Sequence, residues 1–331
     1  MGTRNAKYAG GRNLVGQRAR FTPFGLGIDL LSKTTVARIA VEQLGGKPRA
    51  SFAKERTMSA QSTEFILGHP EGELDHLGIL SRAFDRFTRQ LFAEAGLKDG
   101  MRVLEIGSAS GDVAMVAAEF VGPHGSVVGI EQSPEAVDLA TRHATGRGLN
   151  NIRFVQASFD EDLPFEREFD ALVGRIVLMF LPQPSVTLRR LARHVKPGGL
   201  VVFQEPDMSW AKSVPPVPTV EKAAGWMRQM FEASGADSEI GPKLHALYKG
   251  AGLPDPKMKV DGMIYGSEGD GPSLLAESIR AMLPGIEHLG LAVADEIDIG
   301  TFEDRARAEL AASDASMSSP LLVSAWARTP V

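Results

Sequence analysis

Short apolar segments alternate with helical segments between residues 101 and 205, and this alternation constrains the fold more than any other feature of the chain. The apolar segments predict strands at Met101–Ile106, Ser126–Glu131, Ile152–Gln156, Phe169–Gly174 and Leu200–Glu205. The segments between them predict helices at Gly111–Phe120, Pro134–Thr145 and Ser185–Val195. Strands that are joined by single helices form βαβ units, so we expect an α/β fold with a mostly parallel sheet and helices on both faces.

The segments on either side of this core divide the chain into four expected parts. These are a basic arm at residues 1–57, an N-terminal helical segment at 58–96, the core at 97–205, and a helical cover at 206–331 that supplies the last two strands of the sheet. In the second part, Leu77, Leu80 and Phe84 recur at spacings of three and four, which predicts a helix from Glu73 to Gly96. In the fourth part, we expect a loop at 206–218, helices at Thr219–Ala233, Ile240–Ala251, 273–290 and 302–312, a linker at 311–319, and strands at Lys257–Tyr265 and Leu321–Trp326.

Residues 1–57 carry an excess of positive charge. They contain eleven lysines and arginines and three acidic residues, so the segment has a net charge of +8, whereas the whole chain has −5. Three interpretations remain open: a disordered basic arm, an Arg-rich and acid-poor organelle presequence, and a natural start of the protein at Met58, just before ordered patterning begins. A peptide that spans Arg56 to Gln61 would contradict the third interpretation.

The composition of the 331 residues excludes several classes of function. The chain has no cysteine, which excludes disulfides, thiolate catalysis and zinc sites built on cysteine, and no residue cluster predicts another metal site. A net charge of −5 gives no overall positive field for a nucleic-acid partner. The longest apolar runs are far shorter than the roughly 20 residues of a membrane-spanning helix, so we expect no membrane partner and a cytoplasmic protein. The oligomeric state stays open.

Residues 103–112 combine the end of an apolar strand, a turn of small residues and the start of a helix. The small residues of the turn are Gly107, Ser108, Ala109 and Gly111. Small side chains allow a ligand to lie close to the backbone at the carboxyl edge of the sheet, where the helix N-terminus offers free N–H groups. Glu105 lies beside this turn, and its carboxylate would repel a diphosphate but attract the ammonium group of an amino acid. The sign of that charge favours S-adenosylmethionine over a dinucleotide.

The ends of the next two strands carry further candidate ligand-binding residues. Glu131 ends the second strand, where a carboxylate can accept hydrogen bonds from both hydroxyls of a ribose. Gln132 is then placed to contact the adenine edge. After the third strand, Ser158 or Asp160 is placed to bond the adenine amine while Phe159 packs on the ring. A dinucleotide-binding fold also has an acid at the end of its second strand, so Glu131 supports a nucleoside ligand without specifying the reaction.

Together these motifs resemble the class I S-adenosylmethionine-dependent methyltransferases, and more narrowly the ubiquinone/menaquinone-biosynthesis-type methyltransferase domain. The resemblance covers about residues 97–205 and includes, in order, VLEIGSASGD, VVGIEQSPEAVDLA, FDALVGRIVLMFLP and LRRLARHVKPGGLVVFQE. It implies a Rossmann-like, seven-stranded sheet in which Leu321–Trp326 is an antiparallel last strand, with helical insertions around it. The chain departs from the family pattern at Ala109, where glycine is usual, and at Ser158, where an acid is usual.

The resemblance also implies which residues hold S-adenosylmethionine. The residues around the methionine part would be Glu105, Gly107, Ser108, Ala109 and Gly111, with Gly174 and Arg175 near the methyl end. Glu131 would hold the ribose, and the residues that flank the adenine would be Gln132, Ser158 and Phe159.

The expected reaction is transfer of a methyl group to an O, N or C nucleophile of a small-molecule acceptor by in-line displacement. A base is needed only where the acceptor must lose a proton. Glu205 and Asp207, at the end of the fifth strand, are the candidate catalytic residues, and the alternative role for both is to cap a loop. Other candidate bases are His69, His245 and His288. The residues that would line an apolar acceptor pocket, or else pack in the core, are Met208, Trp210, Trp226, Met227 and Met230.

Two other functions remain open. An NAD(P)-dependent oxidoreductase also uses a glycine-rich turn followed by an acid, but Gly107 and Gly111 do not match the G-x-G-x-x-G spacing of that class. A non-catalytic relative would bind the cofactor, or nothing, and would act through contacts with another protein.

Overall fold

The computed structural model describes residues 70–159, 163, 165 and 168–331. The basic segment 1–57, the alternative start at Met58, and the candidates His69 and Asp160 lie outside the described residues. In this described part of the chain, no helix combines the length and the apolar character that crossing a membrane requires. The same residues contain no group of three or more acidic or histidine side chains that could hold a metal ion.

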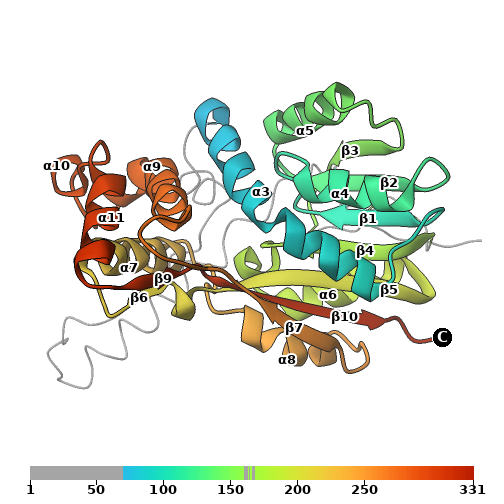
Figure 1. Ribbon diagram of the computed structural model, residues 1–331. Helices are drawn as coiled ribbons and strands as arrows, with labels where there is room; N and C mark the ends of the chain where they lie inside the picture. The colour runs from blue at the N-terminus through green and yellow to red at the C-terminus, as the bar shows by residue number, and fades with distance from the viewer. Residues whose placement is uncertain (1–69, 160–162, 164, 166–167) are drawn as a thin grey trace, which may run out of the picture. The chain divides into compact units, whose positions relative to one another are not determined.

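A seven-stranded sheet with the strand order β3-β2-β1-β4-β5-β10-β7 forms the centre of the fold (Figure 1). Its strands are β1 (Arg102–Ile106), β2 (Ser126–Glu131), β3 (Ile152–Gln156), β4 (Phe169–Arg175), β5 (Val195–Asp207), β7 (Lys257–Asp261) and β10 (Leu321–Arg328). Strands β1 to β5 are mutually parallel, and β10 runs antiparallel to both of its neighbours. The structure thus confirms the predicted α/β Rossmann-like fold with a mostly parallel sheet and an antiparallel last strand.

Helices cover both faces of this sheet, because the strands in its middle bury side chains on both sides. Val103 of β1 belongs to one buried cluster and the next residue, Leu104, belongs to another, as the alternation along a strand requires. One face carries α3 (Pro70–Ala95), α4 (Asp112–Val121) and α5 (Pro134–Gly146), and the other carries α6 (Pro184–Leu191) and α8 (Leu244–Gly250) (Figure 1). The parallel order brings the carboxyl ends of β1, β2, β4 and β5 to one edge.

A second sheet of three short strands, in the order β6-β9-β8, lies in the cover. Its strands are β6 (Lys212–Val214), β9 (Ser316–Ser318) and β8 (Ile264–Tyr265). The helices of the cover are α7 (Pro218–Ala233), α9 (Gly271–His288), α10 (Ala294–Ile297) and α11 (Phe302–Ala312). In the chain, β6 follows β5, β8 follows β7, and β9 precedes β10, so the order β5-β10-β7 of the large sheet is repeated in the small one.

Three predictions for the cover were wrong. Lys257–Tyr265 is not one strand, because the chain leaves the large sheet after five residues and β8 pairs with β9 instead. The break falls at Gly262, where an added Cβ atom would lie 2.6 Å from Leu321 Cδ2, so the Leu321 side chain would have to shift to admit one. The expected loop at 206–218 contains β6, and the expected linker at 311–319 contains β9. Strands of three residues are too short to show an apolar alternation in the sequence.

Tyr248 of α8 is fully buried against the large sheet. Its hydroxyl donates to the Ala325 carbonyl oxygen at 2.7 Å and lies 3.3 Å from the Val201 carbonyl oxygen. We expect Tyr248→Phe to lower the free energy of unfolding by about 1 kcal/mol, because it deletes this bond and keeps the ring. Urea unfolding followed by circular dichroism measures the change. Unaltered or higher stability would show that the hydroxyl contributes nothing to the net free energy.

Candidate functional site

The turn between β1 and α4 holds three residues in the left-handed region of backbone conformation. The φ angles are 71° at Gly107, 45° at Ala109 and 87° at Gly111. A Cβ atom at Gly107 would lie 2.8 Å from Val177 Cγ2, and one at Gly111 would lie 2.9 Å from Phe154 Cζ. Both positions therefore require glycine by conformation and by space. Ala109 adopts its conformation at a cost of roughly 1–2 kcal/mol, which glycine would avoid.

Glu105, the penultimate residue of β1, is fully buried. Ser108 Oγ donates to its Oε2 at 2.5 Å, whereas its Oε1 has no hydrogen-bond partner among the described residues. Burial raises the pKa of this carboxyl to about 8; the Ser108 hydroxyl opposes the shift and the charge of Glu131 adds to it. A buried acceptor oxygen without a partner is costly, so this position favours a ligand that brings a donor, such as an ammonium group.

Glu131, at the end of β2, links this strand to the turn. Its Oε2 accepts a hydrogen bond from the Ala109 N–H at 3.0 Å, and its Oε1 accepts from the N–H groups of Gln132 (2.7 Å) and Ser133 (3.1 Å). A carboxylate has about four positions for hydrogen bonds, so these three bonds orient it and leave acceptor capacity for a further donor. The geometry suits the predicted role of Glu131 with a ribose, which stays a prediction.

Arg175, at the end of β4, is a buried cation beside the same turn. Its side chain is 6% exposed, it donates from Nη1 to Thr88 Oγ1 at 2.9 Å, and it lies 3.8 Å from Asp85 Oδ1. Burial lowers the pKa of the guanidinium, and the carboxylates of Asp85, Asp112 and Glu105 raise it again. The end of β4 therefore places positive charge within reach of the acidic turn, as expected for a group near the charged end of an amino acid.

The predicted adenine-side residues gather at the ends of β2 and β3. Gln132 is exposed and follows Glu131 directly, whereas Phe159 is buried and Ser158 is half-buried. The N–H of Ala157 donates to the Glu131 carbonyl oxygen at 3.0 Å, which holds the segment after β3 beside the end of β2. The structure thus brings Gln132, Ser158 and Phe159 to the same edge as the turn, and their contact with an adenine stays a prediction.

The two candidate catalytic residues both act as caps. Glu205 is fully buried, and it accepts hydrogen bonds from the N–H groups of Val177 (3.1 Å), Leu178 (2.9 Å) and Met179 (3.4 Å) in the turn after β4. Burial raises the pKa of its carboxyl to about 7, although these three hydrogen bonds act to lower it. Asp207 Oδ1 accepts from the Ser209 N–H at 3.0 Å and the Ser209 hydroxyl at 2.6 Å. His245 and His288 are exposed residues of α8 and α9.

A buried polar chain between α3 and the sheet was missing from our sequence analysis. Thr88 Oγ1 accepts from Arg175 and donates to Gln204 Oε1 at 2.9 Å, and Gln204 Nε2 donates to Ser324 Oγ at 3.1 Å. A signal for it exists in the sequence, because Thr88 stands four residues after Phe84, on the apolar side of the helix. A polar residue on a buried helix face implies a polar partner opposite it.

Comparison with known proteins shows what the part of the chain that contains this site is similar to. Residues 97–243 match the family model described as a methyltransferase domain. Aklanonic acid methyltransferase of Streptomyces sp. strain C5 is 33% identical over 134 residues, which are 38% of this chain and 61% of that protein. The ubiquinone/menaquinone biosynthesis C-methyltransferase of Pseudomonas putida is 33% identical over 130 residues, 39% of this chain and 49% of that protein. A solved S-adenosylmethionine-dependent methyltransferase from Aquifex aeolicus is 18% identical, with a TM-score of 0.42, and the match covers 59% of this chain and 93% of that one.

The chain spans about half to three-fifths of the length of these two curated relatives. The match nevertheless includes the turn, β1 to β5 and the first part of the cover. Residues 97–243 therefore match a methyltransferase domain, and this part of the chain is similar to the two named methyltransferases.

The raised pKa of Glu105 predicts how the stability of the ligand-free protein changes with pH. The folded carboxyl keeps its proton up to a pH of about 8, whereas in the unfolded chain it ionises near its ordinary pKa of 4.5. Its stabilising contribution is therefore lost as the pH rises between these values. We expect Glu105→Gln to reduce the fall in melting temperature between about pH 5 and pH 8, as measured by calorimetry. Glu239→Gln, at an exposed position, is the control, and equal slopes for both variants would contradict the burial argument.

Proposed function

We propose that the whole chain is an S-adenosylmethionine-dependent methyltransferase that transfers a methyl group to an O, N or C nucleophile of a small-molecule acceptor. The observation that carries this proposal is the buried Glu105 carboxylate, whose Oε1 has no partner among the described residues, beside a turn that Gly107 and Gly111 keep free of side chains. The names of both curated relatives refer to small molecules, which supports an acceptor of that class.

The charges of the site favour a sulfonium amino acid over a dinucleotide. The carboxyl groups of Asp85, Asp112 and Glu105 all interact with the Arg175 guanidinium, and Glu131 adds a negative charge near Glu105, whose own carboxyl is favoured to ionise when a cation binds beside it. A diphosphate would add negative charge to this excess, whereas S-adenosylmethionine carries a sulfonium and an ammonium against one carboxylate. We therefore assign Glu105 to the ammonium, Arg175 to the carboxylate and Glu131 to the ribose. An NAD(P)-dependent oxidoreductase is not favoured.

The chain contributes mainly alignment to this reaction. S-adenosylmethionine supplies a methyl group that its sulfonium already activates. The turn and the bonds of Glu131 fix the position of the ligand, and orientation of this kind is worth up to about 7–11 kcal/mol in favourable cases. Where the acceptor must lose a proton, Asp207 is better placed than Glu205 to take it. Glu205 is occupied by three backbone N–H groups, whereas Asp207 bonds Ser209 through Oδ1 alone among the described residues.

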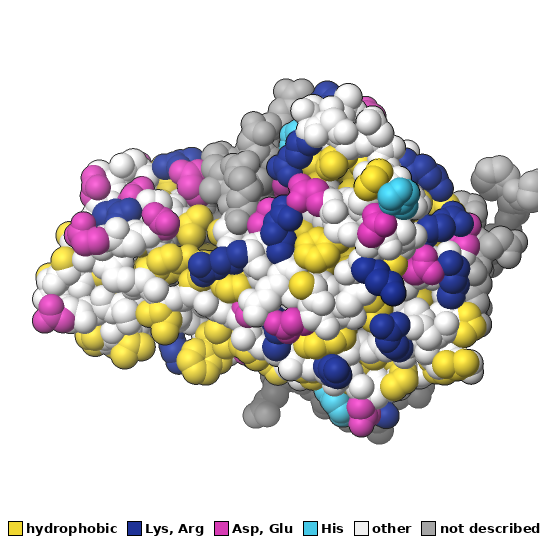
Figure 2. All heavy atoms as spheres, turned by 45° about the vertical axis from the view of Figure 1, so that its right-hand side comes forward, with side chains coloured by type: hydrophobic (Ala, Val, Ile, Leu, Met, Phe, Trp, Pro, Cys, Tyr) yellow, Lys and Arg dark blue, Asp and Glu magenta, His cyan; other side chains and the backbone are white. Residues whose placement is uncertain are grey.

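We also propose that the protein is cytoplasmic, acts on a small molecule and binds neither nucleic acid nor a membrane. On the face shown in Figure 2, Lys and Arg side chains are interspersed with Asp and Glu, which supports this part of the proposal. Fractionation of cells with an antibody to the chain tests the location. Recovery of the protein with a membrane or nucleic-acid fraction would overturn it.

The cofactor assignment predicts that the protein binds S-adenosylhomocysteine and not NAD in isothermal titration. We expect Gly107→Arg to abolish this binding, because the new side chain would occupy the space beside the turn and collide with Val177. Gly148→Arg is a matched control, since Gly148 also has a positive φ, is exposed, and has no atom within 4 Å of an added Cβ. Circular dichroism verifies folding, and Glu131→Gln serves as a second variant with weakened binding. Unchanged affinity in both binding-site variants would overturn the assignment.

Transfer of a labelled methyl group separates an enzyme from a non-catalytic relative. The wild-type protein, supplied with S-adenosylmethionine that carries a labelled methyl group and a small-molecule extract of cells, is expected to label at least one acceptor. The Gly107→Arg variant provides the background. Cofactor binding without any labelled acceptor would favour the non-catalytic alternative.

A further inference from the structure

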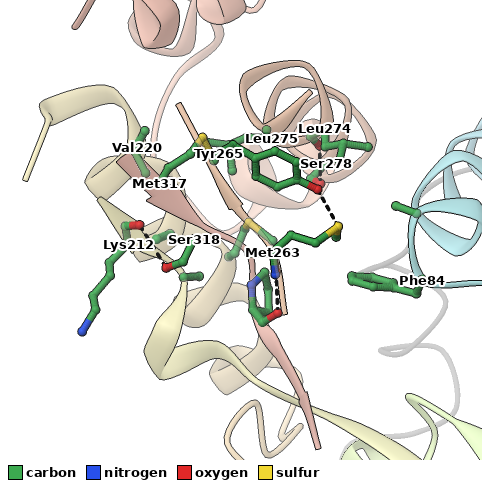
Figure 3. A pocket seen from close by; sticks show the side chains of 17 residues that line it. Phe84, Lys212, Val220, Met263, Tyr265, Leu274, Leu275, Ser278, Met317 and Ser318 are labelled. Atoms are coloured by element: carbon green, nitrogen blue, oxygen red, sulfur yellow. Dashed lines mark hydrogen bonds between the residues drawn. The ribbon is translucent and has the colours of Figure 1, made fainter. Parts of the chain in front are cut away.

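A cavity of about 70 Å³ lies in the cover, outside the set of residues that our sequence analysis assigned to the cofactor. Three helices and the small sheet surround it (Figure 3). The main side chains come from α3 (Phe84), α7 (Met227), α9 (Leu274 and Leu275) and the small sheet (Tyr265 and Met317). Of the five Met and Trp residues that the sequence suggested for an acceptor pocket, Met227 lines this cavity and the other four do not.

The wall of this cavity offers a ligand apolar surface and almost no free polar group. Tyr265 donates its hydroxyl hydrogen to Met263 Sδ at 2.7 Å, and Ser278 Oγ donates to the Leu274 carbonyl oxygen at 2.7 Å. The amine of Lys212 points away from the cavity in Figure 3, and it lies 4.9 Å from the centre of the Trp210 ring. Polar side chains that already have hydrogen-bond partners within the protein gain nothing from a polar ligand. The cavity therefore favours apolar groups.

The cavity begins one helical turn away from Thr88, the hydrogen-bond partner of Arg175, to which we assigned the carboxylate of the cofactor. Phe84 precedes Thr88 by four residues on α3, which is about 6 Å along the helix axis. Thr88 Oγ1 accepts the hydrogen bond of Arg175 at the end of β4, and it also lies 3.4 Å from the Phe84 carbonyl oxygen. On the other side, Ala211 lines the cavity just after the turn that follows β5. The wall thus begins four residues along the chain from Thr88 and from Asp207, the last residue of β5, and continues into the cover.

We propose that this cavity binds the apolar end of the methyl acceptor, so that the acceptor is a lipophilic molecule with a short alkyl group remote from the methylated atom. This inference rests on the proposed methyltransferase function. The volume limits what enters, because an apolar protein cavity that holds one benzene measures about 150 Å³. A cavity of about 70 Å³ therefore takes one end of the acceptor. The flexible thioethers of Met227, Met263 and Met317 allow the wall to adapt to that group.

Two variants of α3 test the cavity directly. Ala83→Phe fills it, because Ala83 is one of its lining residues. Ala93→Phe makes the same substitution at an exposed position of the same helix, outside the cavity. The probe is 4-butylphenol, titrated by NMR, and S-adenosylhomocysteine is titrated separately into each protein. Should circular dichroism show that Ala83→Phe is unfolded, Leu275→Trp fills the cavity from α9 instead.

The wild type and Ala93→Phe are expected to bind 4-butylphenol with equal affinity. Ala83→Phe, in which the cavity is filled, is expected to bind it about tenfold or more weakly. All three are expected to bind S-adenosylhomocysteine equally. If S-adenosylhomocysteine binds but 4-butylphenol does not, or if the filled variant binds 4-butylphenol as well as the wild type, the cavity inference is overturned and the proposed function stands. If S-adenosylhomocysteine fails to bind the wild type, the proposed function fails instead.

A separate measurement tests whether the acceptor is lipophilic. Labelled methyl groups from the transfer reaction are expected in products that partition into chloroform, and the amount is expected to fall in Ala83→Phe but not in Ala93→Phe. Labelled products that all stay in the aqueous phase, at an equal rate in both variants, would overturn the inference while supporting the proposed function.

Discussion

Close contact between the backbone of residues 107–111 and the end of β2 is the constraint on which the rest of the site depends. The Ile130 carbonyl oxygen accepts hydrogen bonds from the first two N–H groups of the turn, at 2.9 and 3.2 Å. Gly129, on β2, has no room for a side chain, because a Cβ atom there would lie 2.5 Å from Ser108 Oγ. The Glu131 carboxylate also holds the turn to β2, because it accepts a hydrogen bond from the Ala109 N–H. Small residues are therefore required both in the turn and in β2, so that the backbone of the turn can lie at the edge of the sheet without side chains over it.

Two fully buried glutamates show how the same side chain can serve different purposes. Glu205 accepts three backbone N–H bonds, so its charge is compensated by the protein itself and it holds β5 to the turn after β4. Glu105 has one hydroxyl donor, and its second oxygen has no partner in the described part of the chain. Burial raises the pKa of both carboxyls, to about 7 for Glu205 and about 8 for Glu105. The difference in partners, rather than in burial, separates a structural carboxylate from one that is suited to a ligand.

The sequence predicted the large sheet and the position of the turn because both leave strong local signals. Buried strands appear as runs such as Val103–Ile106, and the turn appears as consecutive small residues after such a run. In the small sheet, β6 and β9 left no signal because they have three residues each, and β8 was predicted only as the end of a longer strand, because its pairing joins segments more than 50 residues apart. The surroundings of Arg175 could not be predicted either, because no sequence pattern indicates that Arg175 bonds Thr88 and that Thr88 bonds Gln204. Side-chain partners between distant elements follow from packing, which single-sequence patterns do not specify.

The repeated strand order of the two sheets has a mechanical consequence. Each strand of the small sheet continues a strand of the large one through a short connection, at Met208–Ala211, at Gly262–Met263 and at Ser319–Pro320. Three covalent links side by side resist twisting and sliding, but they permit bending about a line that crosses all three. A bend about that line would change the separation of Phe84, on α3, from Tyr265, on β8.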